Sequence, residues 1–264
     1  MVYADLHVHT TRSDGSLTLS TLPDAARDAG VAVVAVTDHD RLHPALERPI
    51  NTVDGITVVS GIELRVETPG GQRIDLLGYG AQPTPALDDE LTRIQRDRVE
   101  RGRAMVDRCE SRLGVDLGLT VEEGFGRPHL ARAIDAHPDT DLNYEEAFEE
   151  LIGNDGPCFV ARDVTPFEQG QRLLDESCAL VGLAHPLRYG DPESALALTE
   201  HLDAVERFYP YGREVDTALV DRALSEYDLV ATGGTDAHEM ELGRSGLDKS
   251  SYRPIAAVLE RTED

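Results

Sequence analysis

Short apolar runs rich in valine alternate with longer amphipathic stretches along this chain of 264 residues. Such alternation is typical of β-strands and α-helices that follow one another around a largely parallel sheet. A helix is predicted at residues 17–29, where serine and threonine mark its start and Gly30 marks its end. The predicted strands cover residues 3–8, 31–37, 56–61, 74–80, 158–161, 179–184, 204–208 and 229–233. We therefore expect an α/β protein, with one large domain or two small ones.

The stretch from about residue 85 to residue 155 differs, because its apolar residues follow a helical spacing and no predicted strand interrupts it. These apolar residues are Leu87, Leu91, Ile94, Val99, Met105, Val106 and Leu113. Pro83 and Pro85 precede the stretch, and glycine and proline within residues 153–157 follow it. The pattern predicts a helical insertion.

The chain is strongly acidic. Aspartate and glutamate number 50 against 25 lysines and arginines, so the formal net charge is −25, and Lys249 is the only lysine. A surface of this sign should repel duplex nucleic acid and anionic membranes, so neither is an expected partner. The acidic residues are spread along the chain, whereas a docking patch for a basic partner would concentrate them in one block. This spread favours adaptation to high salt, where a short Debye length screens the self-repulsion.

No targeting or membrane segment is evident. The longest apolar run, residues 31–36, is too short to cross a bilayer, and the first residues lack the pattern of a signal peptide. Cys109, Cys158 and Cys178 are odd in number and widely spaced, which favours buried reduced thiols over disulfides or a zinc knuckle. A soluble, cytoplasmic protein is expected.

Metal-binding side chains recur at the ends of the predicted strands. His7 and His9 alternate on the first strand, and His-x-His is a natural chelating pair, although alternate residues on a strand also meet by chance. Further predicted strands end in Asp38-His39-Asp40, Glu63, His185 and Asp236-Ala237-His238. Strand ends at one face of an α/β barrel are where such folds assemble their active sites.

These residues and two further motifs resemble the PHP (polymerase and histidinol phosphatase) family. The motifs are Asp5-Leu6-His7-Val8-His9-Thr10, Ser13-Asp14-Gly15, Thr37-Asp38-His39-Asp40, Gly61-Ile62-Glu63, Gly126-Arg127-Pro128-His129, Ala184-His185-Pro186 and Thr235-Asp236-Ala237-His238. Their order and spacing are most similar to the branch of 3′,5′-nucleotide phosphatases and 5′-to-3′ exonucleases of short RNA. The resemblance implies a single domain over residues 1–264, built as a distorted (β/α)7 barrel with a helical insertion at about residues 85–155.

The resemblance also implies up to three divalent metal ions at the C-terminal ends of the strands. It assigns His7, His9, Glu63 and Asp236 to one metal, Glu63, His129 and His185 to a second, and Asp14, His39 and His238 to a third. It makes Asp236, Glu63 and His238 the catalytic residues. Imidazole combined with carboxylate suits Mn²⁺, Fe²⁺ or Zn²⁺, and no thiolate is offered for a closed structural zinc site.

Two arginines are candidates for binding a substrate phosphate. Arg127 stands beside His129 in its motif, and Arg188 follows His185 by three residues. A guanidinium group matches the geometry of phosphate, although a surface ion pair is the alternative for either arginine.

Other polar residues near the motifs have supporting roles in this interpretation. Asp5, Asp38 and Asp40 are expected to orient imidazoles, and Tyr189 either stacks on a base or packs. The histidines outside the motifs, expected to be exposed or hydrogen-bonded, are His43, His137 and His201.

The activity implied by the resemblance is hydrolysis of phosphate esters of nucleotides or short oligonucleotides by a metal-activated hydroxide. A histidinol-phosphate phosphatase shares the metal motifs and differs only in its pocket, but the helical insertion favours the nucleotide branch, because a lid over the site restricts substrates. A metal-binding module without turnover is the third possibility. Such modules often lose ligands, whereas every ligand position is filled here.

Overall fold

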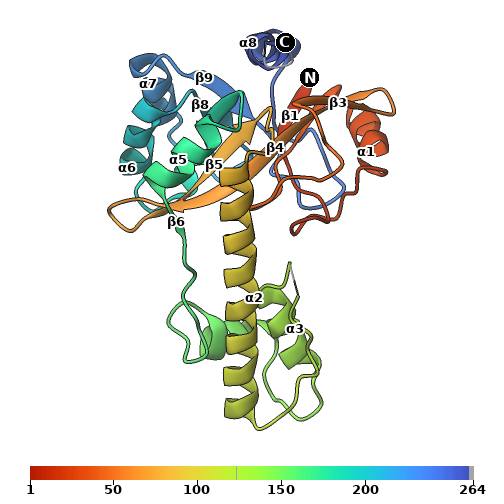
Figure 1. The fold of residues 1–264 in the computed structure, drawn as a ribbon, viewed down its shortest axis with the longest axis vertical. Coiled ribbons are helices and arrows are strands. Elements are labelled where there is room, and N and C mark those ends of the chain that lie inside the picture. The colour runs from red at the N-terminus through yellow and green to blue at the C-terminus, as the bar shows by residue number, and fades with distance from the viewer. Residues whose placement is uncertain (123, 262–264) are drawn as a thin grey trace. The chain divides into compact units, whose positions relative to one another are not determined.

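The computed structural model describes residues 1–122 and 124–261, and its contacts divide the chain into two compact units (Figure 1). The first unit is Met1–Asp88 together with Thr165–Asp264, and the second is Asp89–Val164. Each unit buries a hydrophobic cluster of its own, so the two are described in turn.

The first unit is built around one curled sheet. Its strands follow the order β1-β2-β4-β5-β7-β8-β9, with β3 and β6 added beside β4. The strands are β1 (Ala4–Val8), β2 (Val33–Val36), β3 (Ile50–Val53), β4 (Ile56–Glu67), β5 (Arg73–Tyr79), β6 (Thr165–Pro166), β7 (Leu180–Leu183), β8 (Ala204–Phe208) and β9 (Val230–Gly233). Neighbours in this order are parallel, except that β5 is antiparallel to both β4 and β7.

The two ends of this strand order meet. Val8 forms a parallel bridge with Ala237, the backbone N–H of His9 donates to the Ala237 carbonyl at 2.9 Å, and the N–H of Ala237 donates to the His7 carbonyl at 3.2 Å. This pairing joins β1 to the segment that follows β9. The expected α/β fold, a distorted seven-stranded barrel, is confirmed, with β5 running against the other strands of the barrel.

Helices cover the outside of this sheet, and strands β1 and β2 are buried along their whole length. Burial on both faces explains why β2 is a continuous apolar run rather than an alternating pattern. The helices are α1 (Leu22–Ala29), α5 (Phe167–Asp175), α6 (Pro192–Ala197), α7 (Ala218–Glu226) and α8 (Lys249–Glu260). Helix α1 ends as predicted at Gly30, which has a φ of 69° that glycine adopts without strain.

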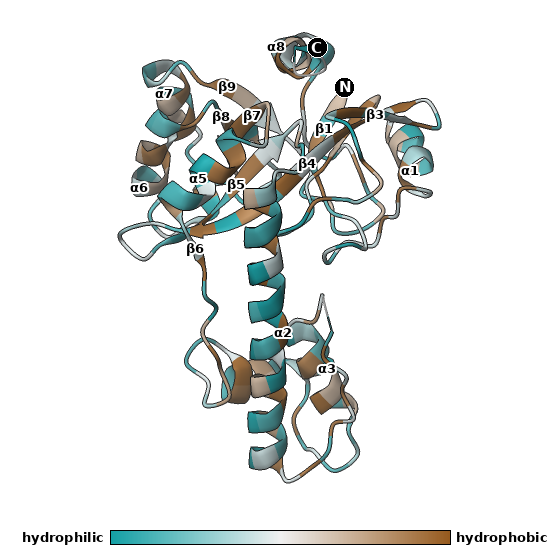
Figure 2. Cartoon of the chain, viewed as in Figure 1, coloured by the Kyte–Doolittle hydropathy of each residue, from teal (hydrophilic) through white to brown (hydrophobic). Residues whose placement is uncertain are grey.

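The second unit is helical. It contains most of α2 (Pro85–Leu113), followed by α3 (Arg127–Ala136) and by α4 (Tyr144–Ala147), which continues as a π-helix over Phe148–Ile152. Its core includes Met105, Cys109, Leu130, Ile134 and Cys158. Figure 2 shows α2 as largely hydrophilic, and none of the helices among residues 1–122 and 124–261 is long and apolar enough to cross a membrane.

Three local expectations are corrected. Residues 158–161 form a turn and irregular chain rather than a strand, because Cys158 is buried in the helical core of the second unit. The helix predicted from residue 17 begins at Leu22, since the hydroxyls of Thr18 and Thr21 bond to nearby backbone and to each other in a turn before it. The strand predicted at residues 56–61 continues to Glu67, so Glu63 lies inside it rather than after it. The short strands β3 and β6 were not predicted.

The cysteines are free thiols, as expected. Cys109 and Cys158 are buried, and Cys178 is partly buried. Burial raises the pKa of both the Cys109 and the Cys178 thiol to about 12, which keeps them protonated and unreactive near neutral pH.

Candidate metal centre

The ends of the barrel strands bring possible metal ligands together in the first unit. His7 lies on β1 and His9 follows it directly, and both rings are fully buried with their centroids 5.2 Å apart. The parallel direction of the barrel strands places the segments after β1, β2, β7 and β9 at the same edge of the sheet. Three overlapping groups of possible ligands result among the described residues.

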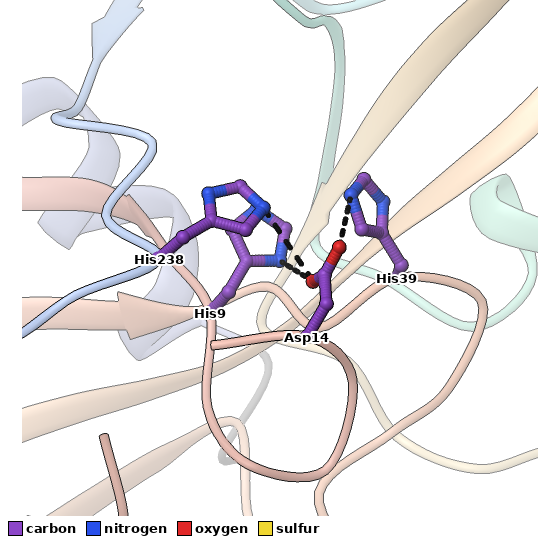
Figure 3. A group of neighbouring side chains, drawn as sticks. All are labelled: His9, Asp14, His39 and His238. Carbon is purple, nitrogen blue, oxygen red and sulfur yellow. Dashed lines mark ion pairs between the residues drawn. The ribbon is translucent and has the colours of Figure 1, made fainter. Parts of the chain in front are cut away.

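The first group is His9, Asp14, His39 and His238, whose ligand atoms all lie within 4.8 Å of one another. Figure 3 shows the Asp14 carboxylate pointing between the imidazoles. Its Oδ1 lies 3.9 Å from His9 Nδ1 and 3.4 Å from His238 Nε2, and its Oδ2 lies 3.8 Å from His39 Nε2. Three imidazoles therefore face one carboxylate.

The second group centres on the buried carboxylate of Glu63. Its Oε1 lies 3.4 Å from His7 Nε2, and its Oε2 lies 3.4 Å from His9 Nε2 and 2.8 Å from His39 Nδ1. Asp236 Oδ1 approaches the same two histidines of β1, at 3.1 Å from His9 Nε2 and 3.5 Å from His7 Nε2. Glu63 thus joins imidazoles from several strand ends, as a bridging ligand would.

The third group is Glu63, Asp75 and His185, all buried. His185 Nε2 lies 2.9 Å from Glu63 Oε1 and 3.7 Å from Asp75 Oδ2. Asp75 was not predicted as a ligand, because it lies near the start of a predicted strand rather than after its end. Since β5 runs in the opposite direction, the start of β5 lies at the edge where its neighbours end. The reversed direction of β5 is the observation that identifies Asp75 as a possible ligand.

These carboxylates and imidazoles perturb one another strongly. Burial raises the pKa of Glu63, but the neighbouring His39 and His7 outweigh it and hold that pKa well below its usual value. Burial lowers the pKa of His39, but Glu63 and Asp14 outweigh it and raise that pKa to about 9. Burial lowers the pKa of His9, which stays below its usual value. In the metal-free protein, protonated imidazoles therefore supply positive charge beside the buried carboxylates.

Although some lie within ion-pair distance of a neighbour, several buried polar atoms of this cluster make no well-aligned hydrogen bond among the described residues. They are His7 Nε2, both ring nitrogens of His9, Glu63 Oε2 and His185 Nδ1. A buried polar atom left unsatisfied costs about 1–3 kcal/mol, so several in one place need an explanation. Coordination of divalent metal would satisfy them, and the mixed imidazole and carboxylate donors fit Mn²⁺, Fe²⁺ or Zn²⁺.

The PHP domain family model matches residues 5–154, more than half of the chain. The chain belongs to the PHP family. The resemblance inferred from the motifs is confirmed.

Curated relatives of this PHP protein match it over most of their length. It is 30% identical to the phosphoribosyl 1,2-cyclic phosphate 1,2-diphosphodiesterase of Eggerthella lenta over 89% of this chain and 93% of that one. It is 28% identical to the 3′,5′-nucleoside bisphosphate phosphatase of Chromobacterium violaceum, over 94% and 90% of the two chains. It is 26% identical to the 5′-3′ exoribonuclease of Salmonella typhimurium, over 92% and 89%.

A solved structure supports the fold. A proposed metal-dependent phosphoesterase from Bifidobacterium adolescentis superimposes with a TM-score of 0.79 at 22% identity, covering 97% of this chain and 96% of that one. At this identity the likeness concerns the fold alone.

The possible ligand His7 contacts Glu206, which was not predicted. Glu206 Oε1 lies 3.1 Å from His7 Nδ1, and Glu206 Oε2 accepts the backbone N–H of His185 at 2.7 Å. Glu206 lies within β8 and is fully buried. A carboxylate beside the second ring nitrogen leaves Nε2 as the ligand atom. The signal in the sequence that could have identified Glu206 was a charged residue inside a buried strand.

The three aspartates expected to orient imidazoles have other partners. Asp5 accepts hydrogen bonds from the Thr235 hydroxyl at 2.6 Å and the Thr235 backbone N–H at 2.8 Å. Asp38 accepts from the Thr10 hydroxyl and from the Ser13 hydroxyl, both at 2.7 Å. Asp40 accepts the backbone N–H of Arg65 at 3.1 Å. Asp5 and Asp38 therefore fix the loops that carry ligands rather than the imidazoles.

Arg188 lies at the cluster. Its Nη1 donates to Asp236 Oδ2 at 3.0 Å and to the Tyr209 hydroxyl at 2.9 Å, while its side chain remains 52% exposed. Tyr209, which was not predicted, donates to the same Asp236 oxygen at 2.8 Å. Tyr189 packs, as one of its two alternatives proposed, because its hydroxyl donates to the Ala184 carbonyl at 3.0 Å and accepts from the backbone N–H of Asp75 at 2.9 Å.

Arg127 and His129 lie in the second unit. The Arg127 guanidinium donates to the Asn154 side chain at 3.0 Å and lies 5.6 Å from the centre of the Phe159 ring. His129 Nδ1 accepts the backbone N–H of Gly126 at 3.0 Å. Their roles in phosphate and metal binding stay predictions.

The histidines outside the motifs belong to none of the ligand groups among the described residues, as expected. His43 and His137 each accept a backbone N–H two residues further along the chain, at 3.2 Å. His201 pairs with Glu200 at 3.2 Å and is exposed.

Gly234 packs directly against His7, so Gly234→Ala should damage the centre. An added Cβ would lie 2.3 Å from the His7 backbone nitrogen and 2.4 Å from His7 Cβ. We expect the free energy of unfolding to fall by roughly 1–3 kcal/mol, together with weaker Mn²⁺ binding. Denaturant unfolding and metal analysis measure the two effects. Gly190→Ala, where an added Cβ meets nothing within 4 Å, is the control and should change neither.

Proposed function

We propose that this PHP protein is a metal-dependent phosphoesterase that acts on phosphorylated nucleotides or short oligonucleotides. The observation that carries the proposal is a set of three overlapping groups of possible ligands, two of which share Glu63, with buried ligand atoms that make no well-aligned hydrogen bond among the described residues. The curated relatives, named for cleavage of phosphate esters, support the same reaction class.

The first unit would hold the metals through the residues already described. We assign Asp14, His39 and His238 to one ion and His7, Glu63 and Asp236 to another, with His9 near both groups. Glu63, Asp75 and His185 would hold a third. Bound divalent ions would supply a water of lowered pKa and would neutralise charge on the phosphoryl oxygens.

Side chains around these positions would orient the substrate and the catalytic groups. The proposed catalytic residues are Glu63, Asp236 and His238. Arg188 is half-exposed and already donates to an anionic oxygen of Asp236, so it can also reach a phosphate oxygen. Arg127 is proposed as a second phosphate-binding arginine, on the motif alone.

A substrate panel tests the proposed function. With Mn²⁺ in high salt, we expect release of inorganic phosphate from adenosine 3′,5′-bisphosphate, measured colorimetrically. The panel includes a 5′-phosphorylated RNA dinucleotide, a phosphoribosyl 1,2-cyclic phosphate and histidinol phosphate. Preferential turnover of histidinol phosphate would move the protein to the alternative phosphatase class. No turnover with any substrate and any divalent metal would leave only a metal-binding module.

The helical second unit is proposed to be an insertion within a single PHP domain over residues 1–264. The family model supports this because its match, residues 5–154, continues through the boundary between the units at Asp88 and Asp89.

The excess of acidic residues is proposed to be an adaptation to high salt. A net charge of −25 destabilises the folded chain by self-repulsion, which added salt screens. We expect the Tm to rise steadily when KCl is increased from millimolar to molar concentration at fixed Mn²⁺, as followed by circular dichroism. A Tm that does not depend on salt would contradict the adaptation.

A further inference from the structure

Arg65 holds Asp75, one of the possible metal ligands, in a two-pronged ion pair. The two residues face each other on neighbouring strands β4 and β5. Arg65 Nε donates to Asp75 Oδ1 at 2.7 Å, and Arg65 Nη2 donates to Asp75 Oδ2 at 2.6 Å. The Asp75 side chain is 1% exposed and that of Arg65 is 40% exposed. Both oxygens of a buried carboxylate are therefore already bound to a fixed positive charge.

The other carboxylates of the cluster have an oxygen that faces only imidazoles among their described ion-pair partners. Asp14 lies near His9, His39 and His238. Asp236 is held by Arg188 through Oδ2, but its Oδ1 faces the imidazoles. An imidazole nitrogen is itself a metal ligand, whereas a guanidinium has no lone pair to offer and carries a charge that repels a cation.

Metal binding therefore differs between the three groups. A divalent ion at either histidine-rich group meets imidazole and carboxylate atoms that can serve as its ligands. An ion at the group of Glu63, Asp75 and His185 has to share the Asp75 oxygens with the Arg65 guanidinium and meets its repulsion.

We propose that Arg65 makes the group of Glu63, Asp75 and His185 the weakest of the three metal sites. This inference rests on the proposed metal-dependent function. The histidine-rich groups fill first as the metal concentration rises, and the third fills last.

Mn²⁺ binding to metal-free protein tests the proposal, with free Mn²⁺ followed by electron paramagnetic resonance in high salt. Arg65→Met removes the charge next to the third group. The matched control is Arg73→Met, because Arg73 pairs with Glu67 on the same two strands, where both side chains are about 40% exposed. We expect the weakest equivalent to bind at least about tenfold more tightly in Arg65→Met, and to be unchanged in Arg73→Met.

If Arg65 only positions Asp75 as a ligand, Arg65→Met will weaken Mn²⁺ binding or leave it unchanged, and the proposal is overturned. If Arg65→Met does not fold, Arg65→Gln also removes the charge while keeping a polar side chain; tighter binding of the weakest Mn²⁺ equivalent supports the proposal, and unchanged or weaker binding overturns it. Wild-type protein that binds no Mn²⁺ at all would instead refute the metal-dependent function.

Discussion

Removal of divalent metal is expected to abolish phosphate release from adenosine 3′,5′-bisphosphate, and added Mn²⁺ is expected to restore it. The reason is that bound divalent ions would supply a water of lowered pKa and would neutralise charge on the phosphoryl oxygens, at a place where imidazoles and carboxylates gather as possible ligands. Dialysis against a chelator, followed by activity assays at increasing Mn²⁺, measures the loss and the recovery.

The same experiment should change stability. Ligands that bind only the folded state stabilise it by mass action, by about 2.7 kcal/mol at a concentration of 100 times Kd. We therefore expect the chelated protein to unfold at a lower temperature than the Mn²⁺ form. Activity that survives chelation with no bound metal remaining would contradict a metal-dependent mechanism.

Glu63→Gln is expected to lower kcat by at least about a thousandfold, within the range that one essential electrostatic interaction contributes. Glutamine keeps the size of the side chain but loses the charge that lies within 3.4 Å of His7, His9, His39 and His185. Two cations held close together need that charge between them. Bound metal, measured by elemental analysis, should fall with kcat.

The control for this variant lies on the same strand. Glu67→Gln removes an exposed carboxylate of β4 that pairs with Arg73, and it should leave kcat and metal content as they are. Glu63→Gln protein that keeps its full metal content and turnover would remove Glu63 from the centre.

The histidines and aspartates at strand ends were predictable because parallel strands bring their carboxyl ends to one edge of the sheet. Residues far apart in the sequence therefore meet at that edge. His9, His39 and His185 follow this rule. Asp75 does not, because strand direction is decided by pairing with β4 and β7 rather than by the residues of β5 itself. The pattern of apolar residues reports a strand but not which way it runs.

Three further differences separate the sequence prediction from the structure. Residues 158–161 are apolar enough for a strand, but the helical core of the second unit buries Cys158 instead. Glu206 was overlooked because it lies inside β8, and only its neighbours in space show that its carboxylate contacts His7. Tyr209 directly follows β8, so considering hydroxyl groups at strand ends would have identified it.

The closure of the barrel also orders events during synthesis. β1 completes its pairing with the segment after β9, and Asp5 accepts hydrogen bonds from Thr235, which is 230 positions later in the chain. A growing chain therefore displays His7 and His9 long before Asp236 and His238 leave the ribosome. Because contacts of such long separation form late, the nascent chain cannot assemble the full set of ligands until its last barrel strand has emerged.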